Sequence, residues 1–285
     1  MVCALAYGVS RLVGVLTEDE LTKAMRELEA LGFTPEHILD VGANEGNWGD
    51  EMQARVPGAD FFHIEGNVAL EHFLKDKGRP YRIAIVGDEE KPVTFFKLCD
   101  GGLCSGGSSV FVENTKFGPG MIKEERQMTT IDKLVSDARA DGTCSAQYIC
   151  NIYMGITMQI LHTNIPCVLS GAGTLSHDHQ FDLLKIDVQG AEKIALTGAK
   201  DTLQSVQVIL AETSNVEYNK GAPGTTEMLT FFESLGFQIF DIIELHRKRL
   251  HGHGHGILFQ MDFLLVRKGS PILDAAHQYW VNGGR

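Results

Sequence analysis

The feature that most constrains the fold of this chain is a glycine-containing turn after a short apolar segment. Residues 38–46 read Ile-Leu-Asp-Val-Gly-Ala-Asn-Glu-Gly, and a second apolar run, 61–64, ends at Glu65. A strand that enters a glycine turn and a helix, with a carboxylate about 20 residues later for the two ribose hydroxyls, is typical of nucleoside-binding α/β folds. Glycine is needed at Gly42 and Gly46 because a Cβ would strain the turn or hold the backbone away from a ligand. The pattern predicts a site for an adenosine-type cofactor.

Two details of this turn favour S-adenosylmethionine over a dinucleotide. The spacing from Gly42 to Gly46 lacks the close glycine pair with which a backbone wraps a pyrophosphate at a helix N-terminus. Asp40 stands at the strand end, where a carboxylate attracts the ammonium or sulfonium charge of S-adenosylmethionine but repels a phosphate. An NAD-linked oxidoreductase and a non-catalytic nucleoside-cofactor-binding protein remain alternatives.

Composition narrows the class of partner and the compartment. The 285 residues suit one α/β domain with additions better than two small domains. A net charge of −12 argues against nucleic-acid or anionic-membrane binding, which rest on basic surface, so we expect no nucleic-acid partner. The sequence contains no uninterrupted apolar run long enough to span a membrane, so no transmembrane helix is predicted. The six cysteines lack zinc-like spacing, which predicts free thiols in a cytoplasmic protein and no metal site.

Strand-like and helical segments alternate along most of the chain. Strands are expected at 37–41, 60–64, 81–86, 183–188, 206–211, 237–243 and 262–266. Helices are expected after a capping box formed by Thr17 and Glu20, and at 47–55, 68–75, 192–203 and 227–235. This alternation predicts right-handed βαβ units in a mostly parallel sheet, with ligands at the carboxyl ends of the strands.

The long interval between the third and fourth predicted strands contains an atypical segment. A hairpin is predicted between 93–97 and 108–112, and 128–135 reads as an extended entry into a short helix. From 142 to 176 there is no Asp, Glu, Lys or Arg, although 22% of the chain is charged. We interpret this uncharged segment as foreign to the fold, either an insertion or translated non-coding sequence. A lid over the active site is the functional alternative.

Together these motifs resemble the FkbM-type methyltransferases. The likeness covers roughly residues 34–268 apart from the uncharged segment, and it is carried by 38–46, Glu65, 84–88, 107–111, 130–134, 184–192, 209–212, 218–223 and 260–266. It implies a class I fold, a Rossmann-like seven-stranded mostly parallel sheet with helices on both faces. It also implies S-adenosylmethionine-dependent methylation of a hydroxyl on a small molecule, sugar or lipid-like acceptor. Residues 1–33 would then be a leader and helix, and 269–285 a tail.

The resemblance also implies roles for individual residues. The expected cofactor contacts are Asp40, Gly42, Asn44, Gly46, Glu65, Asp88 and Ser108. Asp187 and Glu212 are expected beside the transferred methyl group as base or acceptor-orienting groups, although Asp187 at this position could also cap the following helix. Tyr218 and Asn219 shape either the acceptor pocket or only a loop. The alternating His251, His253 and His255 are interpreted as a flexible loop near the acceptor side rather than a metal site.

Overall fold

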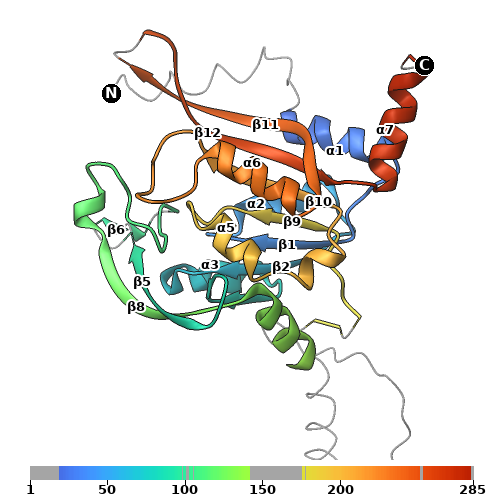
Figure 1. The fold of residues 1–285 in the computed structure, drawn as a ribbon. Helices are drawn as coiled ribbons and strands as arrows, with labels where there is room; N and C mark the ends of the chain where they lie inside the picture. The colour runs from blue at the N-terminus through green and yellow to red at the C-terminus, as the bar shows by residue number, and fades with distance from the viewer. Residues whose placement is uncertain are drawn as a thin grey trace, which may run out of the picture.

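The fold is built on a seven-stranded sheet. A computed structural model describes residues 19–97, 99–100, 103–104, 106–141, 175–176, 178–250 and 253–283. The strand order is β11-β12-β10-β9-β1-β2-β3 (Figure 1). Its strands are β1 (His37–Val41), β2 (Asp60–Glu65), β3 (Tyr81–Ile83), β9 (Leu183–Ile186), β10 (Val208–Ser214), β11 (Phe237–Leu250) and β12 (His253–Arg267). The first five pair in parallel, whereas β12 is antiparallel to both β10 and β11. The predicted mostly parallel seven-stranded sheet is confirmed.

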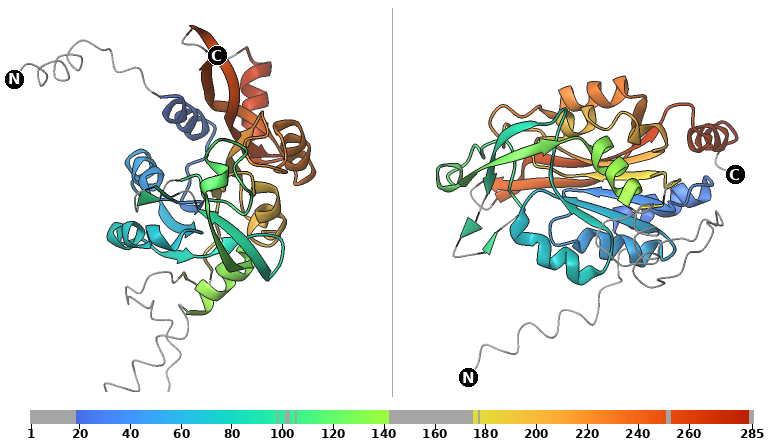
Figure 2. Two further views of the ribbon diagram at one scale, coloured as in Figure 1. Left: turned by 90° about the vertical axis from the view of Figure 1, so that its left-hand side faces the viewer. Right: turned by 90° about the horizontal axis from the view of Figure 1, so that it is seen from below.

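Helices cover both faces of this sheet (Figures 1 and 2). Alternate residues of β1 face opposite layers, so Leu39 packs in one apolar cluster and Ile38 in the other. The Leu39 layer includes α5 (Glu192–Thr197), α6 (Thr225–Ser234) and the helix at 131–141. The Ile38 layer includes α1 (Glu20–Ala30), α2 (Asn47–Arg55) and α7 (Pro271–Val281). Near β3 lies α3 (Glu71–Lys77), preceded by the 3₁₀ turn η1 (Val68–Leu70).

A second, three-stranded sheet corrects the predicted hairpin. Its order is β4 (Ile85–Val86), β8 (Ile122–Thr129) and β5 (Lys91–Lys97), with β5 antiparallel to β8. The predicted pairing of 93–97 with 108–112 is therefore wrong, and a single bridge between Phe96 and Ser109 is what those segments share. A short antiparallel pair, β6 (Cys99–Asp100) and β7 (Leu103–Cys104), lies between them, and from 106 onward the chain lines a cavity at the end of the main sheet. The strand expected at 81–86 divides between the two sheets.

Several element boundaries also differ from the sequence expectations. The N-cap of α1 is Asp19, whose carboxylate accepts a hydrogen bond from the Thr22 backbone N–H, while Thr17 lies outside the described residues. The last strands are much longer than predicted, so His253 and His255 belong to β12 rather than to a loop, and His251 lies outside the described residues. The predicted tail contains α7. The predicted end of the helix at 192–203 is a separate 3₁₀ turn, η3 (Thr202–Gln204).

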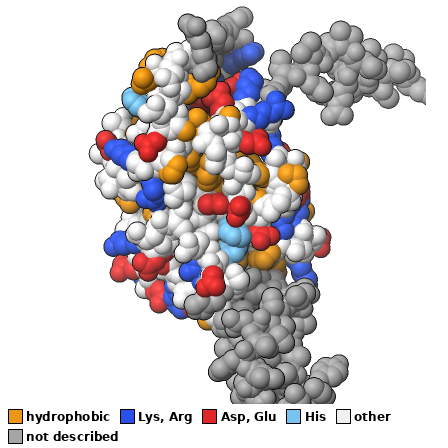
Figure 3. Space-filling model, turned by 90° about the vertical axis from the view of Figure 1, so that its right-hand side faces the viewer, with side chains coloured by type: hydrophobic (Ala, Val, Ile, Leu, Met, Phe, Trp, Pro, Cys, Tyr) orange, Lys and Arg blue, Asp and Glu red, His pale blue; other side chains and the backbone are white. Residues whose placement is uncertain are grey.

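Two surface properties bear on partners. Among the described helices, none combines the length and the apolar character that crossing a bilayer requires. On the right-hand face of the molecule as drawn in Figure 1, acidic and basic side chains lie interspersed (Figure 3). The described part of that face therefore presents mixed charge rather than a field of one sign.

Candidate functional site

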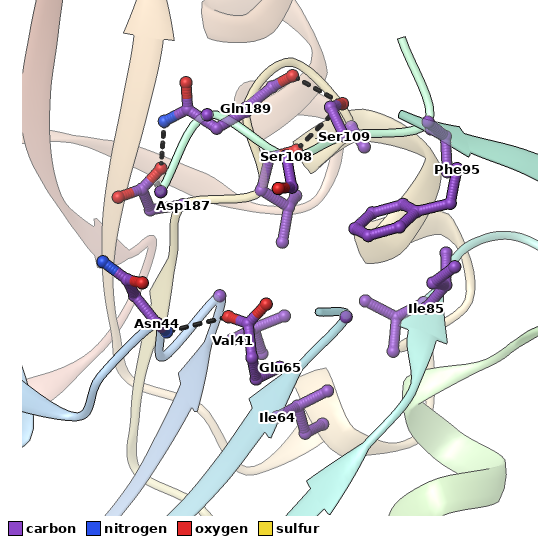
Figure 4. Close-up of a pocket in the computed structure, with 18 of the residues that line it drawn as sticks. Val41, Asn44, Ile64, Glu65, Ile85, Phe95, Ser108, Ser109, Asp187 and Gln189 are labelled. Carbon is purple, nitrogen blue, oxygen red and sulfur yellow. Dashed lines mark hydrogen bonds between the residues drawn. The ribbon is translucent and has the colours of Figure 1, made fainter. Parts of the chain in front are cut away.

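Two adjoining cavities open at the carboxyl ends of β1, β2 and β9. The first, of about 320 Å³, is bounded by strand ends and by the loop at 106–110 (Figure 4). The second, of about 250 Å³, lies between the start of α2 and the ends of β9 and β10, and it also reaches β11 and β12. Gly42, Asn44 and Asp187 line both cavities. The predicted glycine turn thus forms the boundary between them.

The turn after β1 depends on backbone conformations that favour glycine. Gly42 has φ +80°, and a Cβ there would lie 1.8 Å from the carbonyl oxygen of Asp187. Gly46 has φ +76° at the N-cap of α2. The N–H groups of Gly42 and Ala43 donate to the carbonyl oxygen of Ile64 at 2.8 and 3.0 Å. Gly42 is therefore required by the close approach of the chain after β9, as well as by the turn itself.

Glu65 directs its carboxylate into the first cavity (Figure 4). It is 8% exposed, and its two oxygens accept hydrogen bonds from the backbone N–H groups of Asn44 (2.8 Å) and Asn67 (2.7 Å). These bonds fix the carboxylate while each oxygen keeps a second lone pair for a ligand hydroxyl. Burial raises the pKa of Glu65, although the backbone N–H bonds act in the opposite direction.

Asp40, the second predicted acid, is not part of either cavity lining. It is fully buried, and its carboxylate lies 2.9 Å from Nδ1 of His63 and 3.3 Å from Nζ of Lys185. Burial opposes the charge on Asp40, but Lys185 and His63 hold the pKa of this carboxyl below its usual value. Lys185 also donates to the carbonyl oxygen of Gly42 at 2.8 Å. Asp40 therefore stabilises the glycine turn through Lys185. The predicted contact between Asp40 and a charged group of the cofactor is wrong, because Asp40 does not line either cavity.

A chain of amide and carboxylate groups joins the two predicted catalytic acids. Nε2 of Gln189 donates to Asp187 at 2.8 Å and contacts Glu212 at 3.2 Å. Gln260 donates to the same Glu212 oxygen at 2.6 Å. Gln189 adopts φ +54°, an uncommon conformation for a residue other than glycine. The structure thus brings Asp187 and Glu212 together and adds Gln189 and Gln260, which lie in the motifs at 184–192 and 260–266 but had no predicted role.

The surroundings of Glu212 are strongly acidic. Burial and the carboxylates of Asp187, Glu192 and Asp262 raise the pKa of Glu212 to about 9. His246 also reaches this region, with Nε2 3.5 Å from Oδ2 of Asp262. Neither His246 nor Asp262 was predicted to belong to the site, because their proximity depends on the register of two long antiparallel strands.

Asp187 does not serve as the cap of α5. The N-cap of that helix is Ala191, without a side-chain cap bond. Glu192 instead accepts from the backbone N–H groups of Val188 (3.0 Å) and Gly190 (3.1 Å), which closes the turn after β9. Burial raises the pKa of Glu192 to about 7. The capping alternative for Asp187 is therefore wrong, and its carboxylate remains directed toward the cavities.

Of the other predicted site residues, some line a cavity and others support the surrounding turns. Ser108 and Tyr218 line the first cavity. Burial and the neighbouring Glu113 raise the pKa of the Tyr218 hydroxyl to about 12.

Asn219 is buried, and its amide donates to the backbone oxygen of Gln189 at 2.6 Å, so it supports the turn after β9. Asp88 is outside both cavity linings and accepts a hydrogen bond from Lys91 at 2.9 Å. Two further lining residues are apolar: Ile85, from the motif at 84–88, and Phe95, which no motif included (Figure 4).

Comparison with solved structures finds similarity to methyltransferases. Among solved structures, precorrin-6y C5,15-methyltransferase from Geobacter metallireducens is 11% identical with a TM-score of 0.38, and the match covers 89% of this chain and 90% of that chain. An S-adenosylmethionine-dependent methyltransferase from Clostridium acetobutylicum is 8% identical with a TM-score of 0.37, covering 88% and 92%. Because these TM-scores are low, we assign the fold class from the strand order and strand pairing of this chain itself. A search of curated proteins gave no match.

The match to a family model is confined to one part of the chain. Residues 169–239 match the methyltransferase FkbM domain. This range begins inside the uncharged segment and contains β9, α5, β10 and α6, together with Asp187 and Glu212. The match agrees with the motifs at 184–192 and 209–212, so this part of the chain is similar to the methyltransferase FkbM domain.

Proposed function

We propose that the protein transfers a methyl group from S-adenosylmethionine to a hydroxyl oxygen of a small-molecule acceptor. The observation that carries this proposal is the meeting of two cavities at Gly42, Asn44 and Asp187. One cavity suits a nucleoside and the other an acceptor. Bound S-adenosylmethionine supplies a methyl group activated by the sulfonium charge.

The residues of the first cavity fit an adenosine group. Glu65 offers free lone pairs for the ribose hydroxyls, since its backbone bonds leave one acceptor site on each oxygen. Ile64, Ile85 and Phe95 provide apolar surface for the base. Ser108 also lines this cavity and is a candidate contact for the adenine base or for the carboxylate group of the cofactor. Asn44 and the Gly42 turn face the second cavity, where the remainder of the cofactor would reach.

The second cavity supports the proposed acceptor chemistry. Asp187 borders both cavities, whereas Glu212 borders the second alone, so we assign Asp187 as the group nearest the transferred methyl. As the carbon–sulfur bond breaks and the carbon–oxygen bond forms, Asp187 would accept the hydroxyl proton. Gln189 holds the carboxylate for this role through its 2.8 Å hydrogen bond. Glu212 is the second candidate for the base, and Tyr218 is a candidate acceptor contact.

Binding and turnover experiments test the two parts of this proposal. Titration calorimetry with S-adenosylmethionine and with NAD separates the methyltransferase from an oxidoreductase, and we expect saturable binding of the former alone. Incubation with methyl-labelled cofactor and fractionated small-molecule extract should then label an acceptor. Cofactor binding without labelling of any fraction would favour a non-catalytic binding protein.

Removal of the Glu65 carboxylate should weaken cofactor binding. Hydrogen bonds to a charged group contribute about 1.5–3 kcal/mol each, and about 1.4 kcal/mol corresponds to a factor of ten. We therefore expect Glu65→Ala to raise the Kd for S-adenosylmethionine at least about tenfold in calorimetry. Glu89→Ala, which removes an exposed carboxylate outside both cavities, is the control and should leave the Kd unchanged. An unchanged Kd in Glu65→Ala would contradict the ribose assignment.

Most of the uncharged segment should be dispensable for folding. The backbone N–H of Leu175 donates to the carbonyl oxygen of Ala138 at 3.0 Å, so the end of the segment returns to the helix at 131–141. Replacing 142–168 by a Gly/Ser linker about a quarter as long changes loop entropy by only about 1 kcal/mol. We expect the thermal midpoint to stay within about 5 °C. A larger fall would place the segment in the folded core, and loss of turnover alone would favour the lid.

A further inference from the structure

We propose that Glu212, His246 and Asp262 form a binding site for a divalent transition-metal ion in the second cavity. One nitrogen and two carboxylate oxygens, one atom from each residue, all lie within 4.8 Å of one another. The role of the ion in positioning an acceptor rests on the proposed methyl transfer, whereas binding of the ion does not.

Strand register places these side chains on one face of the sheet. Glu212 on β10 is paired with Asp262 on β12, and Asp262 is in turn paired with Glu244 on β11. Carboxylates directly opposite one another on neighbouring strands repel, which destabilises a sheet unless a cation lies between them. Three carboxylates in one row across three strands are therefore an arrangement that a bound cation would stabilise.

The cationic side chain of the cavity lining is already engaged elsewhere. Among the described lining residues Lys185 alone is a lysine or arginine, and its Nζ lies 3.3 Å from Asp40 and 2.8 Å from the carbonyl oxygen of Gly42. Its distance to Asp187 is 3.9 Å, and it is on the side of the cavity formed by β9. Lys185 thus pairs with Asp40, and the described lining offers Glu212 and Asp262 no second lysine or arginine.

The distances suit coordination after small side-chain movements. Zinc-like ions bind histidine nitrogen and carboxylate oxygen at about 2.0–2.2 Å, so two ligand atoms of one ion lie at most about 4.4 Å apart. Nε2 of His246 and Oδ2 of Asp262 are 3.5 Å apart, which is within this limit. A mixed set of imidazole and carboxylate ligands favours manganese, iron, cobalt or zinc over calcium.

Neighbouring groups orient the proposed ligands. Oε1 of Glu244 lies 3.5 Å from Nδ1 of His246, the position in which a carboxylate commonly holds a metal-binding imidazole. The amides of Gln260 and Gln189 both contact Oε1 of Glu212, at 2.6 and 3.2 Å, and Oε2 is the oxygen that we assign to the ion. Gln189 also bonds Asp187, so the proposed ion would be linked to the site of methyl transfer through one side chain.

An ion with three protein ligands keeps open positions that an acceptor oxygen can occupy. A hydroxyl bound to a metal ion loses its proton more readily, which is the change that methyl transfer to oxygen requires. The site therefore favours an acceptor whose hydroxyl can coordinate a metal ion.

Titration calorimetry of the chelator-treated full chain with Mn²⁺ and with Zn²⁺, without cofactor or acceptor, tests the site. We expect one saturable equivalent for the wild type and at least tenfold weaker binding in His246→Ala and in Asp262→Asn. His277→Ala, which removes an exposed imidazole on α7, should bind as the wild type does. Circular dichroism of each variant confirms that it is folded.

A second control addresses the neighbouring histidine run. The triple variant His251→Ala, His253→Ala, His255→Ala should retain the stoichiometric ion. The proposal would be overturned if the wild type shows no saturable binding, or if binding is lost in the triple variant and kept in His246→Ala. Because no methyl transfer is measured, these outcomes are independent of whether the proposed reaction is correct.

Discussion

Asp187→Asn is expected to lower turnover by about 10²–10⁴-fold while the Kd for S-adenosylmethionine stays nearly unchanged. A general base contributes about this factor when it accepts a proton in the transition state, and it adds little to ground-state cofactor binding. Asparagine retains an oxygen that can accept the 2.8 Å bond from Gln189, so the local geometry should persist. Turnover and calorimetric binding should be measured on the same preparation, once the extract screen has supplied an acceptor.

Two comparisons make the Asp187 result decisive. Asp201→Asn removes an exposed carboxylate from the turn after α5 and should leave turnover unchanged. A parallel loss of cofactor affinity in Asp187→Asn would indicate a binding role. Full turnover would eliminate Asp187 as the base and transfer that role to Glu212.

The parts of the fold that depend on short-range pattern were predictable. The strand at 37–41 coincides with β1, and the glycine turn and Glu65 lie at the end of the sheet where the first cavity opens. A short apolar run and the conformational needs of glycine are local properties, so they can be read along the chain. The same applies to the helix after the turn, expected at 47–55 and observed as α2.

The predictions that failed concern contacts between strands that are far apart in the sequence. The pairing of β5 with β8 crosses the loop at 106–121, and nothing local to 91–97 indicates that partner. His246 and Asp262 meet because β11 and β12 extend beyond their predicted ends and because bulges shift their register. Such long-range pairing is specified by the whole sheet rather than by the composition of one strand.

The position of Asp40 is an intermediate case. Leu39 and Val41 pack in one layer, so the side chain between them has to face the other layer. Register places His63 and Lys185 beside Asp40 on the two adjacent strands. The alternation was visible in the sequence, but the two neighbours became apparent only with the strand order β9-β1-β2.

This buried network leads to the largest expected effect on stability. Lys185→Met should reduce the free energy of unfolding by about 3–5 kcal/mol, because removing one partner leaves Asp40 charged in a fully buried position. The carbonyl oxygen of Gly42 also loses the donor 2.8 Å away. Urea unfolding followed by circular dichroism measures the change, and the midpoint should fall without loss of the native spectrum in buffer.

A matched lysine and a double variant separate the buried charge from general effects of substitution. Lys193→Met breaks an exposed pair with Glu227, which should cost less than about 1 kcal/mol. Asp40→Asn combined with Lys185→Met removes the buried charge as well as its lysine partner and leaves a neutral amide beside His63, so it should recover a large part of the lost free energy of unfolding. A loss below about 1 kcal/mol in Lys185→Met, or no recovery in the double variant, would show that Asp40 is not held as a charged group by Lys185. The glycine turn would then be stabilised mainly by its backbone bonds to Ile64.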